Sequence, residues 1–157
     1  MAKDTPSMAK NKMNRCFKAL LDPHPSKKEI DSLWMYFNSC CAYCGKGIQR
    51  SSRTGHLDHV LSSAAGGTNS IYNHVLSCAI CNGDEKREED WHIFLHKKSS
   101  SSELAHEREY KIKVWLQKAP ASISNPEFER EAEHIINKCI AEFDNAVLKL
   151  RRLSKSS

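Results

Sequence analysis

Two Cys-x-x-Cys pairs constrain this chain more than any other feature of its sequence. The first pair is Cys41 and Cys44, and the second is Cys78 and Cys81. Two thiolates at this spacing can fold back onto one ion, so two pairs complete the four-sulfur tetrahedron of a structural zinc site. Such a site has no open coordination position, so the zinc is expected to hold the fold without acting on a substrate. Buried thiols or redox chemistry are the alternative interpretation of these cysteines.

The composition fits one small domain that a bound zinc ion would help to stabilise. Hydrophobic residues make up 39% of the 157 residues, and seven of the residues are cysteines. An odd number of cysteines fits metal-bound thiolates in a reducing compartment better than a disulfide framework. No stretch approaches the roughly 20 apolar residues that span a bilayer, and no secretory signal is visible. We therefore expect a cytoplasmic protein without membrane contact.

Positive charge is concentrated in the first part of the chain. The formal net charge is +5, and residues 1–60 carry ten Lys and Arg against five Asp and Glu. Such a surplus attracts the phosphate backbone of nucleic acids, although solvated lysines are its commoner explanation. The expected organisation is a flexible basic arm over 1–25, a core over 26–98 and a helical C-terminal region over 103–153.

Local patterns predict helices on both sides of a small sheet. A capping box at Ser26 opens a helix over 26–39. Short strands are expected over 54–60 and 72–77. The helix that follows should be irregular in its early turns, because Gly83 is unfavourable there.

The last helix has the clearest signals. Asn125 suits the N-cap and Pro126 the first helical position. An apolar stripe then runs along residues 126–150, and it must be buried either on the domain or on a second copy of the chain. A homodimer through this helix is therefore one prediction.

Polar residues between the two cysteine pairs, and the asparagine directly after the last cysteine, have the chemistry of a hydrolase. A neutral imidazole such as His59 can take a proton from water near pH 7. The oxygen atoms of Asp58 and Asn82 suit a hard divalent cation. The alternative is a turn-capping carboxylate beside a surface imidazole.

One set of residues has the order and spacing of a known motif: Asp58-His59, Gly66-Gly67, Asn73, Cys78-x-x-Cys81-Asn82 and Lys86. Together they resemble the HNH endonuclease family over roughly residues 37–95. The resemblance implies an α+β fold, in which a zinc-clamped ββα-metal core is flanked by N-terminal and C-terminal helices. It also implies a metal-dependent DNA endonuclease that hydrolyses phosphodiester bonds.

The resemblance also implies roles for individual residues. His59 is expected to be the general base, and Asp58 and Asn82 are expected to hold a catalytic Mg²⁺ or similar ion. Asn73 is expected to tie the loop between the strands and orient the histidine. Glu85 is a candidate accessory ligand, with a solvated helix residue as the equal alternative.

Four basic residues are candidate DNA contacts, since arginine and lysine bind phosphate oxygens: Arg50, Arg53, Lys86 and Arg87. A small enzyme of this type resembles type II restriction endonucleases. The alternatives are a phage or junction-resolving HNH nuclease and a non-catalytic zinc-knuckle module that only binds nucleic acid. No pattern in the sequence predicts a recognition site.

Overall fold

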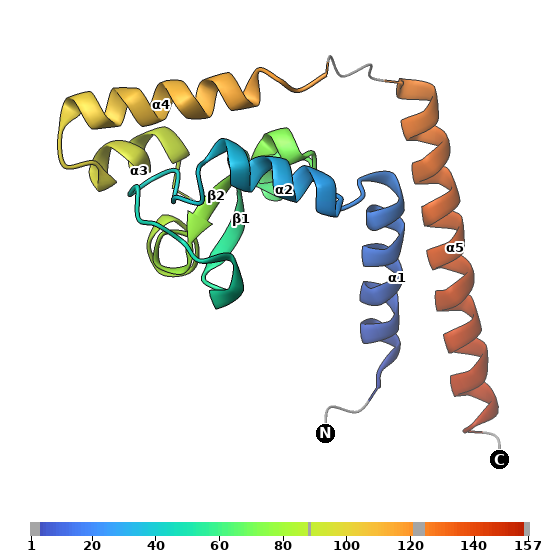
Figure 1. The fold of residues 1–157 in the computed structure, drawn as a ribbon. Helices are drawn as coiled ribbons and strands as arrows, with labels where there is room; N and C mark the ends of the chain where they lie inside the picture. Colours follow the sequence, from blue (N-terminus) through green and yellow to red (C-terminus); the bar gives the residue numbers. More distant parts are fainter. Residues whose placement is uncertain (1–3, 88, 121–124, 156–157) are drawn as a thin grey trace. The chain divides into compact units, whose positions relative to one another are not determined.

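The computed structural model describes residues 4–87, 89–120 and 125–155. Residues 1–3 of the predicted arm, residue 88 of the predicted core and residues 121–124 lie outside these ranges. The chain divides into two compact units, one of residues 22–121 and the other of residues 1–21 with 122–157. Among the described residues, helices accompany one two-stranded sheet, which confirms the predicted α+β class (Figure 1).

The sheet pairs β1 (Gly55–His59) with β2 (His74–Cys78) in antiparallel register. Asp58 lies opposite Val75, and His59 lies opposite His74. The strands therefore start and end within a few residues of the predicted ranges. Three 3-10 turns flank them: Arg50–Ser52 before β1, and Ser63–Ala65 and Ile71–Asn73 in the connection between the strands.

Helix α2 (Lys27–Tyr36) leads into the first cysteine pair and packs against the start of the sheet. The predicted capping box is present, since Ser26 and Glu29 bond to each other's backbone N–H groups. Trp34 is buried beside β1. A Cβ atom on Gly55 would come within 2.5 Å of the Trp34 ring, so the strand begins with the one residue that leaves room for the indole.

A π-helix (Ile80–Lys86) follows β2 directly and is the irregular turn that Gly83 predicted. The hydrogen bonds of a π-helix span one residue more than those of an α-helix, and such turns are frequent at functional sites. Helix α3 (Trp91–Lys98) then begins at Asp90, whose side chain accepts hydrogen bonds from the N–H groups of His92 and Ile93. The chain thus starts a second helix only a few residues after the cysteine site.

Helix α4 (Ser102–Leu116) belongs to the same unit as the sheet. Its Trp115 donates its indole N–H to the carbonyl oxygens of Ile71 (3.2 Å) and His74 (3.0 Å). Arg108 donates to the carbonyl oxygen of Tyr43 at 2.9 Å. The sequence had grouped this helix with the C-terminal helix over 103–153, whereas its buried contacts are with the sheet.

The other unit pairs helices α1 (Pro6–Leu21) and α5 (Pro126–Leu153). Residues 6–21, which fall within the predicted arm, form helix α1, and apolar side chains at helical spacing give this helix a face toward α5. Lys10 Nζ lies 2.9 Å from Asp144 Oδ2. Asn125 caps α5 as predicted, accepting a hydrogen bond from the N–H of Phe128.

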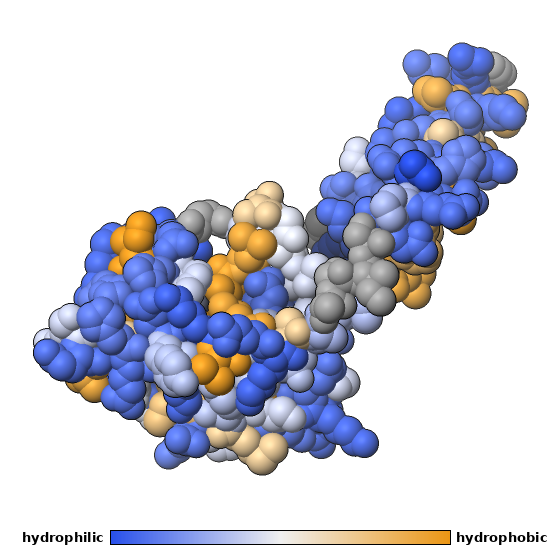
Figure 2. Space-filling view, turned by 90° about the horizontal axis from the view of Figure 1, so that it is seen from above, coloured by the Kyte–Doolittle hydropathy of each residue, from blue (hydrophilic) through white to orange (hydrophobic). Residues whose placement is uncertain are grey.

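Apolar side chains of this second unit stay exposed. No residue of α1 or α5 is fully buried, and Ile135 and Leu150 are 54% and 66% exposed. Figure 2 shows apolar residues of this kind among a mostly hydrophilic surface. Despite its length, neither α5 nor any other described helix has the run of apolar residues needed to cross a membrane.

Candidate functional site

Four cysteines converge as the sequence predicted. The sulfur atoms of Cys41, Cys44, Cys78 and Cys81 all lie within 4.8 Å of one another, and those of Cys44 and Cys78 are 3.9 Å apart. Sulfurs bound to a tetrahedral zinc at ~2.3 Å are about 3.8 Å apart. The cluster therefore fits a four-thiolate zinc site, which joins the turn after α2 to the end of β2.

The electrostatics of the cluster favour a cation. Burial raises the pKa of Cys81 far above its ordinary value, and the neighbouring thiols raise it further. Burial also raises the pKa of Cys41, but backbone N–H groups of Cys44, Cys78 and Tyr43 outweigh it, so the pKa lies below its ordinary value. Several thiolates cannot share this space without a positive charge among them, and a bound Zn²⁺ would supply it.

His59 ends β1 and is held by a residue that the sequence did not suggest. Its Nε2 lies 3.2 Å from Oδ1 of Asn69. The other side-chain atom of Asn69, Nδ2, donates to the backbone carbonyl of Asp22 at 2.8 Å, and the Asp22 carboxylate accepts the backbone N–H of Asn69. Since a carbonyl only accepts, Nδ2 must face Asp22 and Oδ1 must face His59.

This arrangement decides which ring nitrogen of His59 carries the proton. Because Asn69 Oδ1 is an acceptor, His59 Nε2 donates to it. The lone pair of a neutral His59 is then on Nδ1, which is the atom available to take a proton.

A second histidine lies beside the first. The rings of His59 and His74 have centroids 4.0 Å apart, as expected for directly paired strand residues. His74 is buried and donates from Nδ1 to the carbonyl oxygen of Ser70 at 2.8 Å. Burial lowers the pKa of His74, so it adds no charge beside His59 at neutral pH.

Asn73 ties the loop that connects the strands. Its Nδ2 donates to the carbonyl oxygens of Leu61 (2.9 Å) and Thr68 (2.8 Å), and its Oδ1 accepts the N–H of Leu61 (3.0 Å). Gly67 makes this clamp possible, because a Cβ there would come within 1.8 Å of the Leu61 oxygen. These are the loop contacts that the resemblance implied for Asn73.

Asp58 is buried in a small polar network. Its Oδ2 accepts the Tyr43 hydroxyl at 2.6 Å and pairs with Lys86 Nζ at 3.0 Å. Lys86 Nζ also donates to the carbonyl oxygen of His59 at 3.1 Å. Burial, and then the Asp58 charge, raise the pKa of Tyr43 well above its ordinary value, so Tyr43 stays a neutral donor.

The remaining predicted ligands lie on the π-helix. Asn82 is half-buried, one residue after Cys81. Among the described residues, neither Asp58 Oδ1 nor the side-chain amide of Asn82 has a hydrogen-bond partner. The side-chain oxygen of each residue is therefore available to a hard cation. Glu85 is exposed and its carboxylate pairs with Lys98 Nζ at 2.6 Å, so it would have to leave this partner to act as an accessory ligand.

The four predicted DNA contacts differ in accessibility. Arg50 pairs with Asp31 and lies over the Trp34 ring. Arg53 and Arg87 are exposed at backbone positions with positive φ. Lys86 is only 5% exposed and is bound to Asp58, so it does not lie on the surface where a phosphate contact was expected.

Sequence reasoning missed four residues that support the site: Asp22, Tyr43, Asn69 and His74. The pairing of His59 with His74 follows from the strand register, which two short strands joined by a loop do not specify in advance. Asn69 and Asp22 come from separate loops and have no motif of their own. Tyr43 lies inside the first cysteine pair, where only its hydroxyl distinguishes it from a core aromatic.

Comparisons with known proteins agree with this arrangement. Residues 41–97 match the family described as HNH endonuclease. The chain is also 31% identical over 126 residues to "SPbeta prophage-derived putative HNH endonuclease YoqL" of Bacillus subtilis (strain 168). The alignment covers 68% of this chain and 50% of the relative, so the chain spans about half the length of the protein it matches. The paired cysteines, Asp58-His59, Asn73 and Asn82 all lie inside the matched segment, so residues 41–97 are the part of the chain that is similar to the HNH endonuclease family.

Proposed function

We propose that this protein is a metal-dependent DNA endonuclease that hydrolyses phosphodiester bonds. The observation that carries the proposal is the contact between His59 Nε2 and Asn69 Oδ1, from which the proton position of His59 follows. Asn69 accepts the Nε2 proton at 3.2 Å, which leaves Nδ1 free to act as a general base beside the buried carboxylate of Asp58.

In the proposed reaction, His59 Nδ1 takes a proton from a water molecule. The water oxygen bonds to phosphorus while the bond from phosphorus to the 3′-oxygen breaks, and the leaving oxygen takes a proton from solvent. The products are a 5′-phosphate end and a 3′-hydroxyl end. Asn69 contributes by stabilising the imidazolium that forms, because its Oδ1 faces the Nε2 proton.

Asp58 and Asn82 are the proposed ligands of the catalytic ion, with Mg²⁺ as the expected species. A hard divalent cation supplies charge stabilisation to the scissile phosphate and the leaving oxygen. Tyr43 and Lys86 hold Asp58 Oδ2 and thereby fix the direction of its carboxylate. Oδ1 of Asp58 is then the oxygen offered to the ion.

A plasmid-nicking assay with Mg²⁺ tests the proposal. Wild type should nick, and His59→Ala should not, with the zinc content of both proteins unchanged. His56→Ala is the matched control, since His56 lies three residues before His59 on the same strand and should leave nicking intact. Wild type that binds DNA but never nicks it would support the non-catalytic zinc-knuckle module instead.

The biological class of the nuclease is a finer proposal. A type II restriction-like enzyme is our first candidate, and the residues that the structure describes hold one such site. The prophage origin named for the relative favours a phage nuclease as the second candidate. Sequencing the ends of digested genomic DNA separates them, since a restriction enzyme leaves defined ends. Preference for four-way over linear DNA would identify a junction-resolving enzyme.

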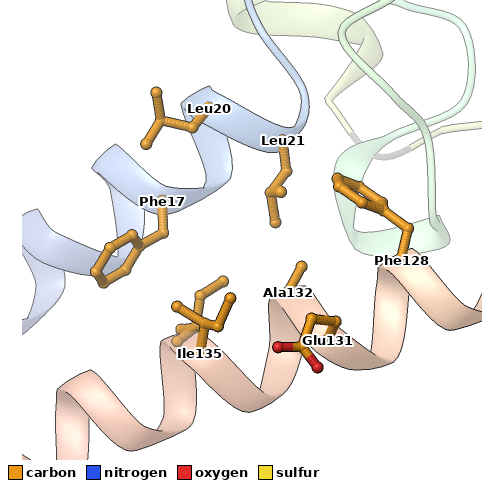
Figure 3. A pocket seen from close by; sticks show the side chains of 8 residues that line it. Phe17, Leu20, Leu21, Phe128, Glu131, Ala132 and Ile135 are labelled. Carbon is orange, nitrogen blue, oxygen red and sulfur yellow. The ribbon is translucent and has the colours of Figure 1, made fainter.

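A homodimer is proposed because one site cuts one strand. Helices α1 and α5 line an apolar cavity of about 310 Å³ (Figure 3). The first turn of α5 is acidic (Glu127, Glu129) and its last turn is basic (Arg151, Arg152). Two copies of α5 packed antiparallel would place opposite charges together while covering exposed Ile135 and Leu150.

Sedimentation measurements test the dimer. Leu150→Asp should shift the protein to a monomer and turn double-strand cleavage into nicking, because Leu150 is 66% exposed on α5. Tyr110→Asp is the control, because Tyr110 is 72% exposed on α4 in the other unit. A wild-type monomer at micromolar concentration would refute the dimer and leave the nicking activity as proposed.

A reducing compartment suits the four thiolates, so the cytoplasm remains the predicted location.

A further inference from the structure

Helices α3 and α4 bring together two histidines and a glutamate that the nuclease reaction does not use. His92 and His96 are four residues apart on α3, so they share one face of the helix. Glu109 of α4 faces them. Its Oε2 lies 3.1 Å from His92 Nε2 and 3.2 Å from His96 Nε2, and the three ligand atoms all lie within 4.8 Å of one another.

These distances are those of metal ligands as well as of hydrogen bonds. Nitrogen and oxygen atoms bound to a tetrahedral zinc at ~2.0–2.1 Å are separated by about 3.3 Å. Both imidazoles direct the same nitrogen, Nε2, at a single carboxylate oxygen. The three ligand atoms are therefore close enough together to share one metal ion.

The second oxygen of Glu109 orients the carboxylate. Its Oε1 pairs with Lys113, one turn further along α4, and the Glu109 side chain is only 12% exposed. A carboxylate ligand held by an outer partner is the usual arrangement at protein metal sites. The His92 and His96 side chains are 47% and 37% exposed, so water can fill the remaining coordination positions.

We propose that His92, His96 and Glu109 bind a second transition-metal ion, of the Zn²⁺ class, that fixes α3 to α4. Two imidazoles and one carboxylate suit borderline divalent metals such as Zn²⁺, Co²⁺ and Ni²⁺ better than Mg²⁺. The site is separate from the four cysteines in ligand type and in the elements that supply it. Glu109 also lies beyond residues 41–97, so the ligand set extends past the segment matched by the family.

The ion would couple two parts of the nuclease unit. Helix α4 holds the carbonyl oxygens of Ile71 and His74 through Trp115, and these two residues flank Asn73. A metal that ties α3 to α4 would therefore hold Trp115 in place and stabilise the segment that connects β1 to β2. The expected effect is on thermal stability, with the reacting groups left unchanged.

Zinc content after dialysis against a weak chelator tests the proposal without any activity measurement. Wild type should hold two zinc ions per chain. The double variant His92→Gln, His96→Gln should hold one, which stays on the cysteines and reports that the protein is folded. His134→Gln is the matched control, because His134 is an exposed helical histidine outside the cluster, and it should hold two.

A titration with Co²⁺ gives a second readout. With Zn²⁺ kept on the cysteines, added Co²⁺ should bind wild type at one equivalent without a thiolate charge-transfer band, and Glu109→Gln should weaken this binding at least tenfold. One zinc ion per wild-type chain and no stoichiometric Co²⁺ binding would overturn the proposal. So would a second ion that survives in the double variant. None of these results depends on whether the protein cleaves DNA.

Discussion

The contact between Asn69 and His59 leads to the sharpest prediction about catalysis. Asn69→Ala removes the acceptor that faces the Nε2 proton of His59. The imidazole can then carry its proton on either nitrogen and can rotate, so Nδ1 is no longer held ready as the base. The backbone N–H and the side-chain Nδ2 of Asn69 both donate hydrogen bonds to Asp22. The variant keeps the first of these bonds and loses the second.

The magnitude follows from the charge that develops on His59. In the proposed reaction the ring becomes an imidazolium, and its 3.2 Å contact with Asn69 Oδ1 becomes charge-assisted. A hydrogen bond to a charged group contributes about 1.5–3 kcal/mol. At about 1.4 kcal/mol for each factor of ten, kcat should fall roughly 10- to 150-fold, with KM nearly unchanged because Asn69 does not touch DNA in this scheme.

Single-turnover nicking of a labelled plasmid measures this change. Thr68→Ala is the matched control: it alters the preceding residue of the same loop and leaves the His59 contact in place. The zinc content of both variants should equal that of wild type, and Asn69→Ala should melt somewhat lower because it loses the hydrogen bond to the Asp22 carbonyl oxygen. Full activity of Asn69→Ala would refute the argument about the proton, and a rise in KM alone would mean that Asn69 binds the substrate.

Three further predictions concern stability. Because burial lowers the pKa of His74 below 6.5, the unfolded chain binds a proton more readily; the free energy of unfolding should fall as pH drops below about 6.5 and level off below the folded pKa, and urea titrations of His74→Gln should lack this component. Lys86→Met leaves the Asp58 carboxylate buried without its cation and should cost about 3 kcal/mol; adding Asp58→Asn should restore much of it, and an unchanged urea midpoint in the single variant would contradict the pairing. Gly67→Ala should lower the melting temperature, since its Cβ would meet the Leu61 oxygen at 1.8 Å, whereas Gly47→Ala meets nothing within 4 Å and should melt as wild type does.

Short-range patterns predicted the parts of the fold that local chemistry determines. The two cysteine pairs predicted the sulfur cluster, because a tetrahedral ion demands that spacing. Ser26 and Asn125 predicted helix starts, since a cap involves residues three positions apart. Gly83 predicted an irregular turn, which the structure contains as a π-helix.

Contacts between distant residues were beyond the reach of these patterns. Asn69 and Asp22 are 47 positions apart and meet only after the strands have paired. The sequence predicted Lys86 as a phosphate contact on the surface. The π-helix instead places it against Asp58, which lies 28 positions earlier in the chain. Residues 6–21 resembled a solvated arm because their apolar side chains pack against α5, which comes much later in the sequence.

The indole of Trp115 sets a lower limit on the size of any working fragment. It bonds to carbonyl oxygens on both sides of Asn73, yet it lies 18 positions after the end of the segment matched at 41–97. Excising that segment alone, for transplantation or for fusion to a second protein, would remove these hydrogen bonds. A portable cassette should therefore retain the chain through Leu116.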